Sequence, residues 1–160
     1  MKPRISNRIA TGALIAALYV VFTYTSSLFG LSSGVIQLRI SEALCVLPLW
    51  ISGSVTGLFI GCILANLLTG AVLWDVIFGS LATLIAAIIT SKMKRCKWCA
   101  PIPAIVSNTI VVPLVLFYVY QVPDSLPYIF LTVFIGEFLS AGVLGWTVIY
   151  IREKRYKKQK

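Results

Sequence analysis

The sequence predicts an all-α integral membrane protein, a bundle of six transmembrane helices with the N and C termini in the cytoplasm. The 160 residues are 59% hydrophobic and have a mean hydropathy of +0.94, whereas a soluble domain is about half apolar and about a quarter charged. Apolar runs long enough to cross a hydrocarbon core of about 30 Å recur along the whole chain. The basic residues gather in short clusters outside these runs, as they do in multi-pass proteins of the cell membrane.

Windows of about 20 residues predict five spans directly. These spans cover Ile9–Leu28, Ser54–Leu68, Trp74–Ser91, Pro101–Tyr120 and Pro127–Ile151. A sixth span is predicted between Val35 and Ser52. It has the weakest signal, because it contains Arg39, Glu42 and Pro48.

The distribution of basic residues favours six spans over five. Apart from Arg39, all lysines and arginines lie in residues 2–8, 92–97 and 152–160. Short loops and ends rich in these residues stay in the cytoplasm. Six crossings place all three clusters on that side, whereas five would place the last cluster outside. The same clustering is a topology signal, so no nucleic acid is expected as a partner.

The first 20 residues also have the basic and then apolar pattern of a signal peptide. We expect this first helix to be retained, because no soluble domain follows it. The sequence has no long loop, low-complexity tract or convincing internal repeat. Residues 1–160 are therefore predicted to form a single domain.

Glu137 is the most informative polar residue, because it stands alone in the apolar run PYIFLTVFIGEFLSAGVLGWTVIYI. A charged group in a membrane costs several kcal/mol unless it has a partner. No basic residue lies near Glu137 within its own span, so its partner comes from another helix or from a ligand. At about 1.5 Å per residue it lies roughly 15 Å below the outer end of its helix.

Other polar residues lie in or near the outer halves of the predicted spans. They are Arg39, Glu42, Asn66, Trp74, Asp75 and, in the turn QVPDSLP, Asp124. With Glu137 they are able to converge on a cavity that opens to the outside. A carboxylate in such a cavity suits a cation or a ligand with adjacent N–H donors.

Each of these residues also has a purely structural interpretation. Arg39 and Glu42 are three residues apart and are able to pair with each other on a helix. Trp74 and Asp75 suit the headgroup belt and the start of a helix, respectively, and Asp124 suits a turn. Asn66 and Asn108 are candidates for hydrogen bonds between helices.

The composition argues against an enzyme. There is no histidine, which removes the commonest general base and metal ligand. A phosphate-binding loop of the G-x-x-x-x-G-K-[ST] type is also absent. Cys96 and Cys99 form a lone C-x-x-C motif, while Cys45 and Cys62 lie in apolar spans, so no metal site or cofactor is predicted and reduced thiols are expected.

Small residues follow a four-residue spacing on the first helix, in the pairs Gly12 and Ala16 and Ala13 and Ala17. Ala141 and Gly145 repeat this spacing in the last span. Such faces let another helix approach closely. Spacing alone does not decide between packing inside the bundle and docking of a partner.

Three stretches carry a resemblance to a known family. VIQLRISEALCVLPLW, GLFIGCILANLLTG and LWDVIFGSLATLIAA are similar to the QueT family, the proposed queuosine-precursor S component of energy-coupling factor (ECF) transporters. The resemblance covers essentially the whole chain. It implies a six-helix substrate-binding subunit, without enzymatic activity of its own, that captures a vitamin-like small molecule from outside.

The resemblance also implies partners and a substrate. S components work in the lipid bilayer with a transmembrane coupling subunit and two ATPase subunits, and Ala13 and Ala17 are similar to the motif on which they dock. The substrate of this family is a 7-deazaguanine precursor of queuosine: 7-cyano- or 7-aminomethyl-7-deazaguanine, or queuine.

The polar residues suit a 7-deazaguanine, which presents an amide N–H beside an exocyclic amine, a carbonyl and a flat face. The hypothesis is that Glu137 or Glu42 accepts the donor edge, that Asn66 or Arg39 contacts the carbonyl, and that Trp74 or a nearby aromatic ring stacks on the base. Asp75 is able to meet an aminomethyl cation, and Asn108 is a further candidate contact. The alternatives are an S component for thiamine, riboflavin or a pyrimidine, a stand-alone secondary transporter for a small solute, and a structural or regulatory membrane subunit that binds no ligand.

Overall fold

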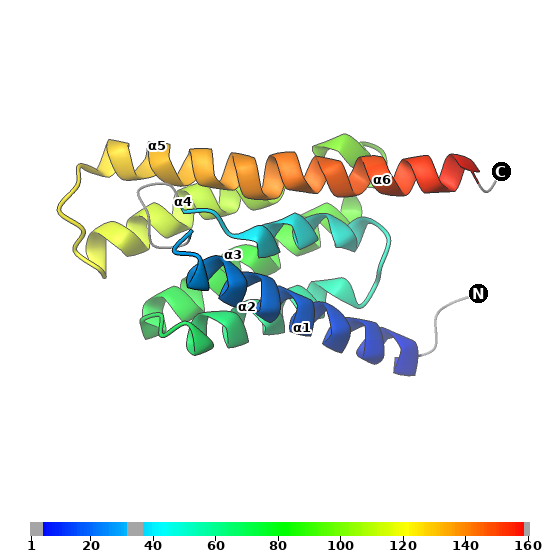
Figure 1. Cartoon of the computed structure of the whole chain (residues 1–160), viewed down its shortest axis with the longest axis horizontal. Helices are drawn as coiled ribbons and strands as arrows, with labels where there is room; N and C mark the ends of the chain where they lie inside the picture. The colour runs from blue at the N-terminus through cyan, green and yellow to red at the C-terminus, as the bar shows by residue number, and fades with distance from the viewer. Residues whose placement is uncertain (1–4, 32–36, 159–160) are drawn as a thin grey trace.

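A computed structural model describes residues 5–31 and 37–158, and all regular structure within these ranges is helical. The all-α prediction is therefore confirmed for the described residues (Figure 1). The elements are α1 (Ile5–Leu28), the 3₁₀ helix η1 (Ile40–Leu49), α2 (Ser54–Leu68), α3 (Leu73–Lys92), the 3₁₀ turn η2 (Lys97–Cys99), α4 (Ile102–Tyr118), α5 (Leu126–Glu137), the π-helical segment η3 (Phe138–Val143) and α6 (Leu144–Lys158).

Within residues 5–31 and 37–158, four helical runs are long and apolar enough to cross a membrane: α1, α3, Lys97–Tyr118 and Leu126–Lys158. The last run joins α5, η3 and α6 into 33 residues, a length of about 50 Å at 1.5 Å per residue. It therefore extends beyond a hydrocarbon core of about 30 Å and carries the basic C-terminal cluster out of it. These runs make the chain a multi-pass membrane protein.

The prediction of a transmembrane α-helix between Val35 and Ser52 is wrong in its geometry. Val35 lies outside the described residues, residues 37–39 are non-helical and η1 is a 3₁₀ helix. At about 2.0 Å per residue, the ten residues of η1 reach about 20 Å. Pro48 contributes to the departure from α-helical form, because proline has no N–H to donate to the preceding turn.

The position of η1 is as unusual as its form. It packs against α1, α3, η3 and α6, and eight of its ten residues are buried. The α-helices instead have faces with exposed large apolar side chains, such as Leu14, Ile85 and Leu131. The only long 3₁₀ helix in the described residues is therefore buried inside the bundle, where α1, α3 and α6 pack against it.

Glycines allow α1 and α2 to approach at the level of their backbones. A Cβ atom added to Gly57 would lie 2.5 Å from the carbonyl oxygen of Gly12, and one added to Gly61 would lie 3.0 Å from the Cα of Ala16. Gly12 and Ala16 are both buried. This pair of small residues thus serves packing inside the bundle, with the close helix contact that such spacing favours.

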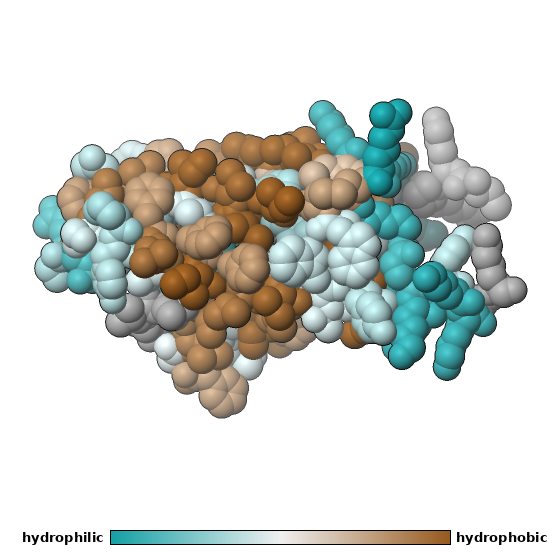
Figure 2. Space-filling view, turned by 90° about the horizontal axis from the view of Figure 1, so that it is seen from above, coloured by the Kyte–Doolittle hydropathy of each residue, from teal (hydrophilic) through white to brown (hydrophobic). Residues whose placement is uncertain are grey.

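Apart from Arg39, the basic residues within the described ranges gather at one end of the molecule (Figure 1). The start of α1 and the end of α6 lie at the same end of the bundle (Figure 1). The α3–α4 connection joins them there, since Lys97 forms a salt bridge of 2.7 Å with Glu153, and the indole Nε1 of Trp146 donates to the carbonyl of Trp98 at 2.8 Å. Figure 2 shows the resulting hydrophilic end beside a broad apolar band.

The expectation of reduced thiols in the α3–α4 connection is contradicted. Cys96 and Cys99 form a disulfide, with their Cα atoms 5.4 Å apart. The η2 turn brings the two residues together, because positions three apart are neighbours in a 3₁₀ turn. Cys45 and Cys62 are free and buried, as their apolar spans predict.

The contact between α1 and α2 leads to a first prediction. Gly57→Ala places a methyl group against the backbone of Gly12, which has no side chain that is able to move away. We expect a loss of about 1–3 kcal/mol in the free energy of unfolding, seen as a lower midpoint in thermal unfolding of the detergent-solubilised protein. Ala13→Val, which adds more volume at an exposed position of α1, is the matched control and should leave the midpoint unchanged.

Candidate functional site

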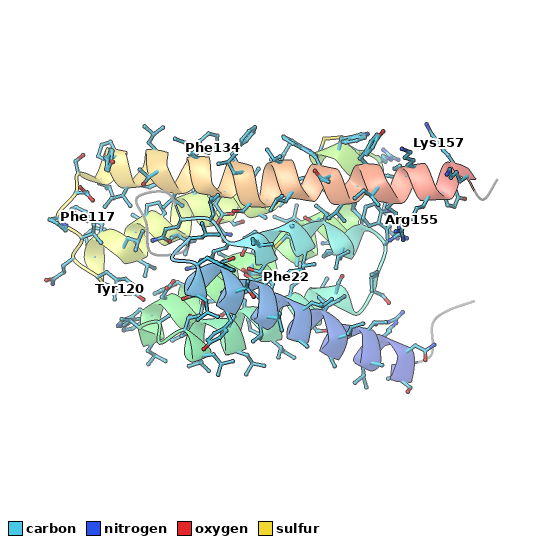
Figure 3. All side chains as sticks on the ribbon, in the orientation of Figure 1. Phe22, Phe117, Tyr120, Phe134, Arg155 and Lys157 are labelled. Carbon is cyan, nitrogen blue, oxygen red and sulfur yellow. A yellow bond between two sulfur atoms is a disulfide. The ribbon has the colours of Figure 1, made fainter. Side chains whose placement is uncertain are left out.

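A polar cavity of about 350 Å³ has Tyr120 in its lining, at the end of the bundle opposite Arg155 and Lys157 (Figure 3). This volume is at the lower end of the range for small-molecule sites, about 300 to 1,000 Å³. The ends of α1, α2 and α4 enclose it together with the segment before η1 and the start of α3. Its lining residues are Thr23, Ser27, Gln37, Arg39, Asn66, Thr69, Gly70, Ala71, Asp75, Val112, Leu116 and Tyr120.

Arg39 reaches this cavity because hydrogen bonds from two sides hold the segment before η1. The backbone N–H of Arg39 donates to Ser140 Oγ of η3, and that of Ile40 donates to Ser26 Oγ of α1, both at 3.1 Å. One residue on, Thr23 Oγ1 donates to Ser41 Oγ at 2.8 Å. The hydroxyls of Ser140 and Ser26 thus satisfy backbone N–H groups that would otherwise be buried without partners.

Gly136 makes room for the same segment on the α5 side. A Cβ atom at this position would lie 2.2 Å from the backbone carbonyl oxygen of Gln37. Contacts this short do not occur between real atoms, so only glycine permits the observed path of the chain. Gln37 and Arg39 therefore enter the cavity lining because of a glycine almost a hundred residues further along the sequence.

Asn66 and Asp75 form the other polar wall of the cavity. Both are buried, Asn66 near the end of α2 and Asp75 in the first turn of α3. A Cβ atom added to Gly79 would lie 3.3 Å from Asn66 Nδ2 and 3.4 Å from Asp75 Oδ1. The amide and the carboxylate are thus held side by side over a residue that lacks a side chain.

Tyr120 is a lining residue that we did not predict. Its hydroxyl accepts the backbone N–H of Val72 at 3.0 Å and donates to Asp75 Oδ2 at 3.3 Å. Burial raises the pKa of Tyr120, and the nearby carboxylate of Asp75 adds to the effect, so the hydroxyl keeps its proton. The sequence offers no signal for this role, since tyrosine at the end of a membrane helix is common in any case.

The two acidic residues favoured by the sequence lie elsewhere. Glu42 is 1% exposed and accepts hydrogen bonds from Tyr19 Oη at 2.5 Å and Cys45 Sγ at 3.1 Å. Glu137 is 6% exposed, and its Oε2 has no hydrogen-bond partner within the described residues. Neither residue lines the polar cavity.

The structure also gives the positions of three further candidate residues: Asn108, Trp74 and Arg39. Asn108 is buried on α4, within interaction range of Glu137 and away from the cavity lining. Trp74 is 53% exposed and stacks on Phe78, with ring centroids 5.9 Å apart. Among the described residues, Lys97 and Glu153 form a salt bridge, whereas Arg39 and Glu42 do not.

A second depression is apolar and lies between α1 and α2. It measures about 870 Å³, and Ala13 and Ala17 contribute to its lining as exposed residues of α1. These two alanines are offset by one position from the buried pair Gly12 and Ala16. The α1 helix therefore carries two stripes of small residues, one used inside the bundle and one facing outwards.

A polar cavity at one end of a multi-pass helical bundle defines a membrane protein with a candidate site for a small molecule. The chain belongs to the QueT transporter family, whose model matches residues 9–154.

One curated relative supports the assignment to this family. The chain is 40% identical over 86 residues to the queuosine precursor transporter QueT of Lactococcus lactis subsp. cremoris (strain MG1363), which corresponds to 53% of this chain and 50% of the relative. The chain thus spans about half the length of the curated relative it matches. No solved structure matches the chain.

The segment before η1 gives a second prediction. Gly136→Ala forces the Gln37 carbonyl away from α5 and pulls Arg39 from the cavity lining. We expect a loss of about 1–3 kcal/mol in the free energy of unfolding from this overpacking. Thermal unfolding measures this loss. Gly142→Ala in the same helical run is the control, because its new methyl group meets ordinary contacts of 3.5 Å or more; equal midpoints for the two variants would contradict the prediction.

Proposed function

We propose that this protein is the substrate-binding S component of an ECF importer and captures a 7-deazaguanine precursor of queuosine from outside the cell. Membership of the QueT transporter family and the name of the Lactococcus relative support the substrate class. The observation that carries the proposal is the cavity in which Arg39, Asn66 and Asp75 converge.

The proposed topology has six crossings, with η1 and α2 as the short second and third ones. An even number of crossings returns the chain to its starting side, in agreement with the start of α1 and the end of α6 at one end of the bundle. The basic residues at that end favour the cytoplasm. The polar cavity at the opposite end then opens to the outside, where a substrate is captured.

Within the cavity, the donors and acceptors match one edge of a deazaguanine. Asp75 is the carboxylate of the lining, so we assign it the amide N–H and the exocyclic amine of the base. Arg39 and Asn66 supply N–H donors for the adjacent carbonyl. The opposite charges of Arg39 and Asp75 suit a neutral base whose acceptor and donors lie side by side.

This assignment changes the roles expected from the sequence. Glu42, Glu137 and Asn108 lie behind the lining, and we propose that Glu42 supports the site by holding η1 against α1 through Tyr19. The stacking role moves from Trp74 to Tyr120, which is the aromatic residue of the lining. An aminomethyl group on the substrate would bring a cation, which Asp75 also attracts.

Substrate capture gives a third prediction. Asp75→Asn removes a charged acceptor and should weaken binding of the preferred 7-deazaguanine by about 10- to 100-fold, because hydrogen bonds to charged groups contribute about 1.5–3 kcal/mol. Calorimetry of the purified protein with 7-cyano- and 7-aminomethyl-7-deazaguanine, queuine, guanine, thiamine and riboflavin measures this change and ranks the ligands.

Asp124→Asn is the matched control for this experiment, since Asp124 is an exposed acid in the α4–α5 connection and is absent from the lining. It should bind like the wild-type protein. Wild-type protein that is folded but binds only thiamine, riboflavin or nothing would overturn the proposed substrate. Equal losses in the two variants would point to a general effect of charge.

The proposed importer also needs a coupling subunit and two ATPase subunits. We place the coupling subunit on the outward stripe of α1, because Ala13 and Ala17 line an exposed apolar groove. Small residues on a membrane-exposed helix let a second helix approach closely. The inward stripe of Gly12 and Ala16 is already occupied by α2.

Docking gives a fourth prediction. Ala17→Leu fills the groove and should abolish co-purification with the coupling subunit and the two ATPases, while the affinity for substrate is unchanged. Leu131→Trp, at a position of α5 that is 56% exposed, should leave the complex intact. Uptake of substrate into vesicles that contain this chain alone would instead favour a stand-alone transporter.

A further inference from the structure

Two connections between helices meet at the rim of the polar cavity. In each connection, a residue with positive φ comes shortly after the end of the preceding helix. Gly70, after α2, has a φ of 75°, and Gln121, after α4, has a φ of 51°. Residues in this left-handed region of backbone angles end helices and turn the chain sharply. Tyr120 precedes Gln121 and lies at the end of the bundle opposite Arg155 and Lys157 (Figure 3).

The hydroxyl of Tyr120 connects the two turns. It accepts from the backbone N–H of Val72, the residue that precedes α3, at 3.0 Å. The N–H groups at the start of a helix have no partner within the helix, so this bond satisfies a group that would otherwise lack one. The same hydroxyl donates to Asp75 Oδ2 at 3.3 Å.

These two bonds act on one short stretch of chain. Val72 and Asp75 belong to the same first turn, as the Asp75 N–H bonds to the Val72 carbonyl at 2.9 Å. Tyr120 therefore fixes both the backbone at the start of α3 and the direction of one carboxylate oxygen. The Oδ1 atom, beside Asn66 and Gly79, is left to face other donors.

We propose that Tyr120 is a positioning residue that sets the specificity of the cavity by orienting the Asp75 carboxylate. The inference rests on the proposed function, because it requires a ligand whose N–H donors meet Asp75. A site built to hydrogen-bond a substrate group rejects an analogue that lacks the group, but only if its polar atoms are held in place. Without the phenol hydroxyl, the Asp75 carboxylate turns. The cavity then discriminates less strongly between a ligand with the N–H donor and an analogue without it.

The test compares two ligands and two conservative variants. The ligands are 7-cyano-7-deazaguanine and the same compound without its exocyclic amine. Tyr120→Phe keeps the ring and removes the hydroxyl. Tyr118→Phe removes a hydroxyl from a neighbouring tyrosine that is 69% exposed and does not line the cavity. We expect Tyr120→Phe to lower the ratio of the two affinities about tenfold, the effect of losing a hydrogen bond to a charged group, and Tyr118→Phe to leave it unchanged.

A double-mutant cycle separates positioning from a general structural effect. In an Asp75→Asn background, Tyr120→Phe should not lower the ratio further, because no carboxylate remains to be oriented. A tenfold loss of affinity for both ligands alike, with the ratio unchanged, would overturn the proposal and leave Tyr120 a structural residue.

Hydrogen exchange gives a readout that needs no ligand. The Val72 amide should exchange faster in Tyr120→Phe than in the wild-type and Tyr118→Phe proteins, and an unchanged rate would overturn the proposed contact. If wild-type protein binds neither deazaguanine while the Val72 amide responds as expected, then the proposed function and the role in specificity fail together although the contact exists. If wild-type protein discriminates between the ligands and Tyr120→Phe does so equally well, then only the inference about Tyr120 fails.

Discussion

The fold depends on one constraint: residues 37–49 are polar-rich at their start, only partly helical, and packed inside a bundle of membrane helices. Non-helical backbone is tolerated at membrane depth only where protein or a water-filled cavity surrounds it and its polar groups find partners. Ser26 and Ser140 accept its N–H groups, and Leu38 N–H donates to the Leu31 carbonyl at 2.8 Å. The bundle is therefore organised around the needs of this segment, and the cavity forms where the segment enters.

The helices on both sides of this segment carry matching adaptations. On one side, the inner face of α1 presents Tyr19, Thr23 and Ser26 as hydrogen-bonding groups at successive turns. On the other side, the long C-terminal helix contributes a glycine at the closest approach and then widens into the π-helical segment that contains Ser140. Insertions of this kind inside helices occur frequently at functional sites. Here the wider turn lies beside the segment that delivers an arginine to the cavity.

Much of this arrangement follows from sequence, and the failures have a physical cause. The limits of α2 are those predicted, and the cavity lining contains three of the seven polar residues that the sequence suggests could converge: Arg39, Asn66 and Asp75. The sequence predicts Glu137 in the cavity because its own span offers no partner, and nothing in that span indicates which side of the helix faces inwards. Lipid and protein interior are both apolar, so a membrane helix lacks the polar stripe that orients a soluble one. The form of η1 was missed for a related reason, because continuous apolar residues do not distinguish a 3₁₀ helix from an α-helix.

The two stripes of small residues lie on the same helix, α1. The rotation of this helix about its axis therefore determines both surfaces together. Gly12 and Ala16 face α2, while Ala13 and Ala17, one position later, are exposed. A single inserted residue turns the following part of a helix by about 100°, since one turn takes 3.6 residues. Such an insertion before Gly12 would turn both stripes away from the surfaces they now face and misalign the tyrosine and hydroxyl groups that face η1. Exchange of α1 between related proteins therefore has to preserve its phase, whereas substitutions at the exposed stripe alone leave the interior intact.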